Sequence, residues 1–216
     1  MKIKAISIIV LILLSGFSVA QEPEIGISNT GIRPLSAFSR NTRSVVEGNI
    51  HLDPEWKETI LTFVERDKKQ KYPSRFNLFL NVIEVKVFKN TYAVAWKDLQ
   101  GAEVEGRTYI PLSDLADVFF GELLYAKDDI RLLKVFTLEL LKANYNPALN
   151  TGRKYDEWNV EEKIILEVGG KPNVIKRKKD IQKALENTAY DRKKLNISSI
   201  NESNLKELID YLTNSK

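Results

Sequence analysis

The chain has 216 residues, a net charge of +4 and no cysteine. The missing cysteine excludes disulfides, thiolate metal sites, a cysteine nucleophile and a lipid-modified N-terminal cysteine. The single histidine argues further against a zinc site. A net charge of +4 is too small to indicate a nucleic-acid partner.

Residues 1–20 have the features of a secretory signal peptide in the usual order. Lys2 and Lys4 precede an apolar run over 5–14, and small residues end the segment at Ala20. The run is shorter than the ~20 residues that span a bilayer. A buried N-terminal helix is the alternative. We expect cleavage after Ala20, a periplasmic or secreted protein of net charge +2, and no transmembrane span in the mature chain.

Residues 21–49 are small and polar, with repeated proline and glycine residues that interrupt any period. This composition predicts a flexible lead-in. Arg33, Arg40 and Arg43 are available to contact a partner there, although a solvated tether is the simpler interpretation. We expect a single domain over residues 50–216, enough chain for one hydrophobic core.

The most apolar part after the signal is 76–110, where hydrophobic residues alternate with polar ones. Period-two alternation predicts three antiparallel strands, at 76–88, 91–96 and 104–110. The apolar phase changes between Val82 and Ile83, which predicts a β-bulge or the exit of the strand from the sheet. Asn90 is expected at a turn with positive φ.

Helical spacing of apolar residues predicts helices along the rest of the chain. The expected segments begin at Asp53-Pro54, at Ser113, at Asp128 and at Asn159, with a short helix around Lys183 and a last one capped by Ser203. The segment 128–144 is apolar nearly all round, so a strand at 130–135 remains an alternative. The predicted fold class is therefore α+β, a small antiparallel β-meander of about three strands packed against several α-helices.

Residues 106–112 (Gly-Arg-Thr-Tyr-Ile-Pro-Leu), followed by Leu115-Ala116 and Gly121, form a short motif. The motif resembles the strand–helix signature of the copper amine oxidase N-terminal-like module. That module is a non-catalytic accessory unit of exported proteins. The resemblance covers only residues 106–121, and we transfer no family function from it.

A loop is predicted over 145–158, where Pro147 and Gly152 disfavour regular structure. It contains Arg153, Tyr155 and Trp158, residue types that are enriched at binding hot spots. These three residues are therefore candidate partner-binding residues. The alternative is that Tyr155 and Trp158 pack the loop onto the core.

A second candidate partner-binding segment is the basic run Lys176, Arg177, Lys178 and Lys179. Residues 171–194 hold nine basic and three acidic side chains, a local net charge of +6. Such a surface suits an acidic protein, an anionic glycan or an envelope surface. A solvated helix start is the alternative.

The sequence contains few groups suited to catalysis. His51 precedes an expected helix, and the sequence has no G-x-S-x-G motif that would supply a nucleophilic serine for it to activate. No phosphate-loop, dinucleotide or calcium-loop motif occurs either. We therefore expect no catalytic residue, cofactor or metal. The acid pairs that a glycosidase mechanism would need are Asp114/Asp117, Asp128/Asp129 and Glu103/Glu105.

These observations predict an exported, non-enzymatic protein that binds another protein. An inhibitor, an immunity-type protein or an envelope accessory protein would fit. The alternative is a small secreted hydrolase that uses paired carboxylates on a glycan or peptide.

Overall fold

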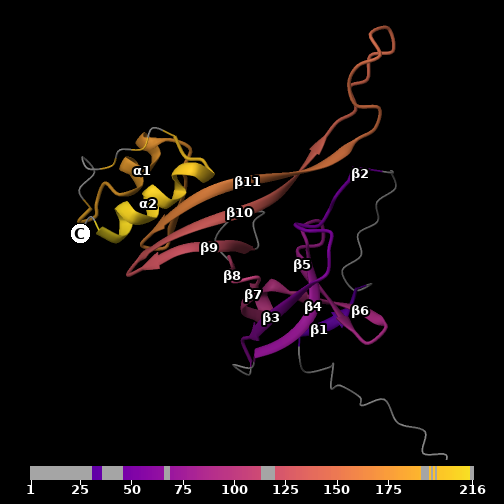
Figure 1. The fold of residues 1–216 in the computed structure, drawn as a ribbon, viewed down its shortest axis with the longest axis horizontal. Helices are drawn as coiled ribbons and strands as arrows, with labels where there is room; N and C mark the ends of the chain where they lie inside the picture. Colours follow the sequence, from indigo (N-terminus) through magenta and orange to yellow (C-terminus); the bar gives the residue numbers. More distant parts are fainter. Residues whose placement is uncertain are drawn as a thin grey trace, which may run out of the picture.

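A computed structural model describes residues 31–35, 46–65, 69–112, 120–190, 195, 197 and 199–214. Over these residues the chain forms a twelve-stranded mixed sheet and two α-helices (Figure 1). The strands are β1 (Ile32–Pro34), β2 (Glu47–Gly48), β3 (Lys57–Phe63), β4 (Lys69–Asn77), β5 (Val82–Val87), β6 (Asn90–Ala95), β7 (Leu99–Val104), β8 (Arg107–Pro111), β9 (Phe120–Lys127), β10 (Ile130–Leu141), β11 (Glu157–Val168) and β12 (Lys171–Val174). The helices are α1 (Lys178–Ala184) and α2 (Glu202–Asn214), and a 3-10 turn covers Trp96–Asp98.

The strand order is β1-β6-β5-β4-β3-β7-β8-β9-β10-β11-β12, and β2 pairs in parallel with β11. All the other strand pairs are antiparallel, and most join strands that are consecutive in the chain. Short hairpins can make such connections, which explains the turns at 88–89, 105–106 and 169–170.

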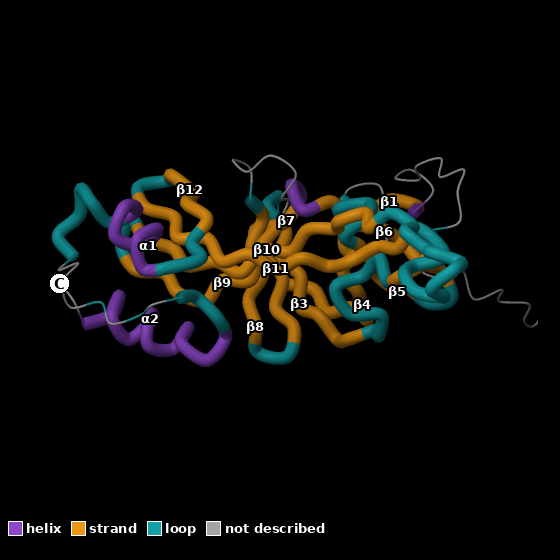
Figure 2. The backbone as a smooth tube through the Cα atoms, turned by 90° about the horizontal axis from the view of Figure 1, so that it is seen from above, coloured by secondary structure: helices purple, strands orange, loops and turns teal. Residues whose placement is uncertain are grey.

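β10 and β11 pair over their full length and form a long two-stranded ribbon. The ribbon runs from the two helices to a projecting tip in Figure 1 and lies at the centre of Figure 2. Residues at every second position of a strand share a face, so Ile130, Leu132, Lys134 and Phe136 lie on one side of β10. Lys134 forms an ion pair with Glu162 of β11 (Nζ–Oε2, 3.3 Å) and divides this face into two apolar parts.

Each apolar part of the ribbon belongs to its own core. Ile130 and Leu132 pack in a core with α1 and α2, whose buried side chains include Ile181 and Leu208. Phe136 belongs to the other core, which the strands β3 to β9 enclose. The centre of that core is an aromatic cluster of Phe76, Trp96, Tyr109, Phe120 and Phe136.

The α+β prediction, a three-stranded meander packed against several helices, is wrong. The segment after Asp53-Pro54 is β3, in which Thr59, Leu61 and Phe63 are buried at alternate positions. The alternation was missed because Thr59 faces inward, and a residue with a hydroxyl group is not counted as apolar when the period is read from the sequence. Threonine is nevertheless a good strand residue.

The helices predicted from Asp128 and from Asn159 are also wrong, because both segments are strands. β10 is buried on both faces: Leu132 packs under the helices, whereas Leu133 and Val135 pack with Ile165 on the opposite face. Burial on both sides removes the period of two, so the sequence resembles a buried helix. The alternative strand at 130–135 was the better interpretation.

The phase change at Val82 has a simpler cause than a bulge. β4 ends at Asn77 and a turn over 78–81 reverses the chain, with Asn81 at φ +56°. Phe88, rather than Asn90, adopts the positive φ of the next turn. Gly106 lies in the β7–β8 turn, at φ +77°, and not within a strand.

The two C-terminal helices are confirmed, at 178–184 and 202–214, although α2 begins at Glu202 and Ser203 therefore lies within it and does not cap it. Leu208 and Leu212 of α2 are fully buried, as the helical spacing predicted. The strand part of the motif at 106–112 is β8, but Gly121 lies within β9 and does not end a helix. The signal segment 1–20 and the helix start at Ser113 lie outside the described residues.

Candidate functional site

His51 lies on the short segment between β2 and β3, which runs antiparallel alongside the end of β4. Leu52 N donates to Phe76 O (2.9 Å), and Leu78 N donates to Ile50 O (2.8 Å). The Asn49 side chain bonds both the N–H and the C=O of His51. His51 is thereby buried and fixed in place, and the element that follows it is strand β3 and not the helix expected there.

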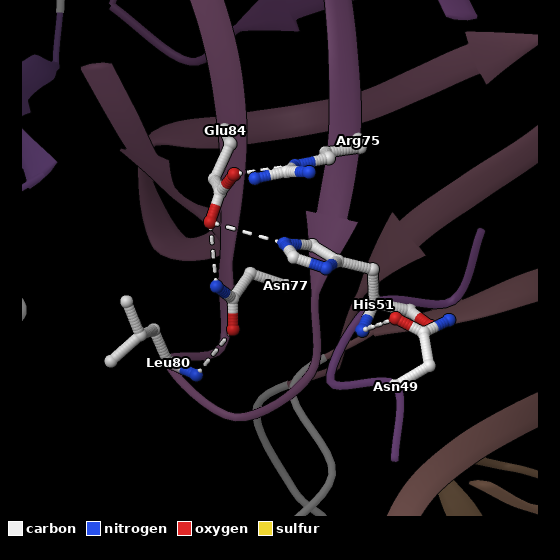
Figure 3. A network of polar contacts seen from close by, with 6 residues as sticks. All are labelled: Asn49, His51, Arg75, Asn77, Leu80 and Glu84. Carbon is white, nitrogen blue, oxygen red and sulfur yellow. Dashed lines mark hydrogen bonds and ion pairs between the residues drawn. The ribbon is translucent and has the colours of Figure 1, made fainter. Parts of the chain in front are cut away.

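Glu84 of β5 is the centre of a buried polar network (Figure 3). Asn77 Nδ2 donates to Oε1 (2.6 Å) and Arg75 Nε donates to Oε2 (2.7 Å). His51 Nε2 lies 3.3 Å from Oε1. The Glu84 side chain is only 3% exposed, so these three groups replace the water that would otherwise solvate the carboxylate.

The network keeps Glu84 ionised. Burial by itself raises the pKa of this carboxyl group, but hydrogen bonds from His51, Asn77 and Arg75 together outweigh burial and lower the pKa to about 2. A carboxylate so stabilised can orient the histidine, as the acid of a catalytic triad does. Glu84 and His51 bond here to Asn and Arg side chains, and no serine hydroxyl is among their described partners.

We expect the stability that Glu84 provides to disappear as the pH falls from about 4.5 to about 2. The folded-state pKa lies below the ordinary value, so the folded protein binds fewer protons in this window and acidification favours unfolding. Urea titrations of the wild type and of Glu84→Gln across this range would measure the effect. A difference in free energy of unfolding that stays constant down to pH 2 would contradict it.

A cavity of about 290 Å³ opens beside this network, and Arg75 lines it. Phe76, Tyr109 and Phe136 of the aromatic cluster line it, together with the apolar side chains of Leu52 and Val104. The remaining lining is mainly charged, with five carboxylates and four basic groups: Asp53, Glu55, Glu105, Glu122, Glu162, Lys57, Arg75, Arg107 and Lys134.

The hydroxyl and amine groups of the cavity do not form an activated nucleophile. Ser74 Oγ donates to Thr59 Oγ1 (2.5 Å), and Lys57 contacts Asp53 (2.7 Å) and Glu105 (2.8 Å). These two carboxylates raise the pKa of Lys57 above its ordinary value. Lys57 therefore remains an ammonium ion at neutral pH and cannot accept a proton from Ser74.

Neither of the two acid pairs that the structure describes forms a facing pair of carboxylates. Glu103 pairs with Lys69, whereas Glu105 belongs to the following turn and pairs with Lys57. Asp128 and Asp129 occupy the β9–β10 turn. Asp114 and Asp117 lie outside the described residues.

Residues 142–156, which we call the hairpin tip, connect β10 to β11 and project from the rest of the molecule (Figure 1). Backbone bonds brace the tip: Asn144 N donates to Arg153 O (3.0 Å), and Asn146 N donates to Thr151 O (2.8 Å). At its base, Asp156 accepts bonds from Lys142 Nζ and from the backbone N–H of Ala143.

The three candidate residues Arg153, Tyr155 and Trp158 have different roles in the structure. Arg153 donates from Nη2 to Lys142 O (3.2 Å) and so braces the tip. Tyr155 is 57% exposed, as is appropriate for a contact residue. Trp158 lies in β11 and packs against Phe79 (ring centroids 5.5 Å apart), which is the alternative considered for it.

The basic run lies at the start of α1, at the opposite end of the ribbon from the hairpin tip (Figure 1). Lys176 and Arg177 donate backbone N–H groups to Asp180 Oδ2 (3.0 and 3.1 Å), and Lys176, Arg177 and Lys179 are exposed, whereas Lys178 is half-buried. The structure therefore does not join the two predicted binding segments into one surface.

Sequence reasoning missed Glu84 and its partners. The available signal was a single carboxylate within the apolar strand Val82–Val87. A charged side chain on a buried strand needs a partner, and Arg75 and Asn77 occupy the adjacent strand.

No family model, curated protein or solved structure matches the chain. Within the described residues, no group of three or more His, Cys, Asp or Glu side chains is placed to hold a metal ion. Neither helix in the described part has the length and apolarity needed to cross a bilayer.

Proposed function

We propose that this chain is an exported, non-enzymatic protein that binds a partner protein through its hairpin tip. Export rests on the signal-like residues 1–20. An inhibitor, an immunity-type protein or an envelope accessory protein would act in this way. The observation that carries the proposal is the exposure of Leu149 (69%) and Tyr155 (57%) on this projecting, internally bonded tip.

Exposed apolar and aromatic side chains are favourable contact groups only if fixing them costs little entropy. The tip meets this condition, because its two strands remain bonded beyond the sheet and Asp156 clamps its base. Lys154 Nζ lies 5.2 Å from the centre of the Tyr145 ring, which restrains a further aromatic side chain. A preorganised tip of this kind loses little freedom on binding.

We expect a photoreactive phenylalanine analogue at position 149 to cross-link one partner protein in cells that express the chain. Phe88 supplies a matched control, because it is equally exposed (69%) and also lies in a β-turn. Mass spectrometry would identify the product. Equal products from positions 149 and 88, or none from 149, would contradict binding through the tip.

A further inference from the structure

One edge of β11 is open over a short stretch. β10 covers the other edge from Glu157 to Val168. On the open side, β2 pairs with 157–158 and β12 pairs with 165–168. Among the described residues none pairs with 159–163 on this side, so the stretch forms a window between two short strands.

The direction of the backbone groups in this window follows from the neighbouring bonds. Asp156 O accepts from Glu47 N (3.0 Å) and Ile164 O accepts from Ile175 N (2.9 Å), so both carbonyls point away from β10. Alternate residues of an antiparallel strand direct both backbone groups to the same side. Val160 and Glu162 therefore present their N–H and C=O groups at the open edge.

The window borders the charged cavity, which Glu162 lines. Each basic group of the cavity is already engaged: Lys57 by Asp53 and Glu105, Arg75 by Glu84, Lys134 by Glu162, and Arg107 by Tyr109 and Glu122. The Glu162 side chain is 51% exposed and retains acceptor capacity. An incoming cation is favoured here over an incoming anion.

We infer that the edge of β11 at Val160 and Glu162 binds an extended basic peptide of a partner protein by strand addition. Main-chain bonds to these two residues would hold the peptide, and a Lys or Arg side chain would reach Glu162. A second copy of this chain fits poorly. An antiparallel pair of β11 edges centred on Glu161 places the two Glu161 carboxylates opposite each other. Each contacts Lys163 of its own strand (3.0 Å), but like charges directly opposite are destabilising.

Amide hydrogen exchange tests whether the edge is open. In the purified protein we expect the amides of Val160 and Glu162 to exchange faster than those of Asn159, Glu161 and Lys163, which face β10. A seven-residue peptide of alternating valine and lysine should slow exchange at Val160 and Glu162 only. Equal protection of all five amides without peptide would overturn the proposal.

Binding of the same peptide, fluorescently labelled, tests the mode of recognition. A version with N-methylated backbone amides has equal charge and should bind about tenfold more weakly or worse, as expected for losing at least one hydrogen bond. The Glu162→Lys variant should prefer a valine–glutamate peptide over the valine–lysine peptide. The Val160→Pro substitution removes a backbone N–H at the edge and should weaken the binding of either peptide to its matching protein. If N-methylation left the affinity of the peptide unchanged, the peptide would be held by surface charge alone, which refutes the proposal. Self-association of the protein that Val160→Pro abolishes would show that a second copy occupies this edge, which also refutes it.

Discussion

Replacing Glu84 with glutamine should lower the free energy of unfolding by about 3 kcal/mol, because it removes one partner of a buried ion pair. The amide keeps the size of the side chain but turns one acceptor oxygen into a donor. That donor would then face Arg75 Nε or Asn77 Nδ2, and neither of these groups can accept its hydrogen. The lower end of the usual range applies, because the Arg75 side chain is 27% exposed and also contacts the Trp56 ring (4.6 Å).

Glu103→Gln is the matched control for this substitution. Glu103 also pairs with a basic group, Lys69, but its side chain is 44% exposed. We expect its loss to change stability by less than about 0.5 kcal/mol. Urea unfolding at pH 7 would compare the two variants, and equal effects would show that burial of the Glu84 network adds nothing.

The network also links the cavity to the segment that carries β2. His51 bonds Glu84, and the backbone on either side of His51 bonds β4 and the following turn. Gly48, at the end of β2, approaches β11 so closely that an added Cβ would meet Trp158 O at 2.4 Å. Loss of the Glu84 charge should therefore loosen the segment that borders both the cavity and the window in β11.

Local patterns were sufficient to predict one amphipathic helix and one loop. α2 is amphipathic and packs one face on the sheet, so the spacing of Leu205, Leu208 and Leu212 was sufficient. The loop predicted over 145–158 covers most of the hairpin tip, because Pro147 and Gly152 disfavour regular structure, and Gly152 does adopt φ +93°.

The remaining elements depend on contacts that are distant in sequence. β10 is buried on both faces and has no polar side to reveal its period. The inward-facing Thr59 of β3 accepts a hydrogen bond from Ser74 of β4, a residue that is distant in sequence. The Glu84 site needs His51, which lies 33 residues earlier in the chain. Such a site cannot be predicted without first knowing that the strand order places these residues together.

Replacing Phe120 with alanine should have the largest effect, a loss of about 4 kcal/mol in the free energy of unfolding. Phe120 is 2% exposed and stacks on Trp96 with ring centroids 4.3 Å apart. Its ring also lies 5.6 Å from Phe76 and 6.2 Å from Phe136. The substitution therefore removes aromatic contacts to β4 and β10 at once and leaves a void between them.

Phe88→Ala is the same chemical change at a position 69% exposed, and we expect it to alter stability by less than about 0.5 kcal/mol. Chemical denaturation followed by tryptophan fluorescence would measure both, since Trp96 reports directly on the stacked ring. A Phe120→Leu variant should recover part of the loss because leucine refills much of the volume. If Phe120→Ala cost no more than Phe88→Ala, the aromatic cluster would not be what holds β4, β9 and β10 around one core.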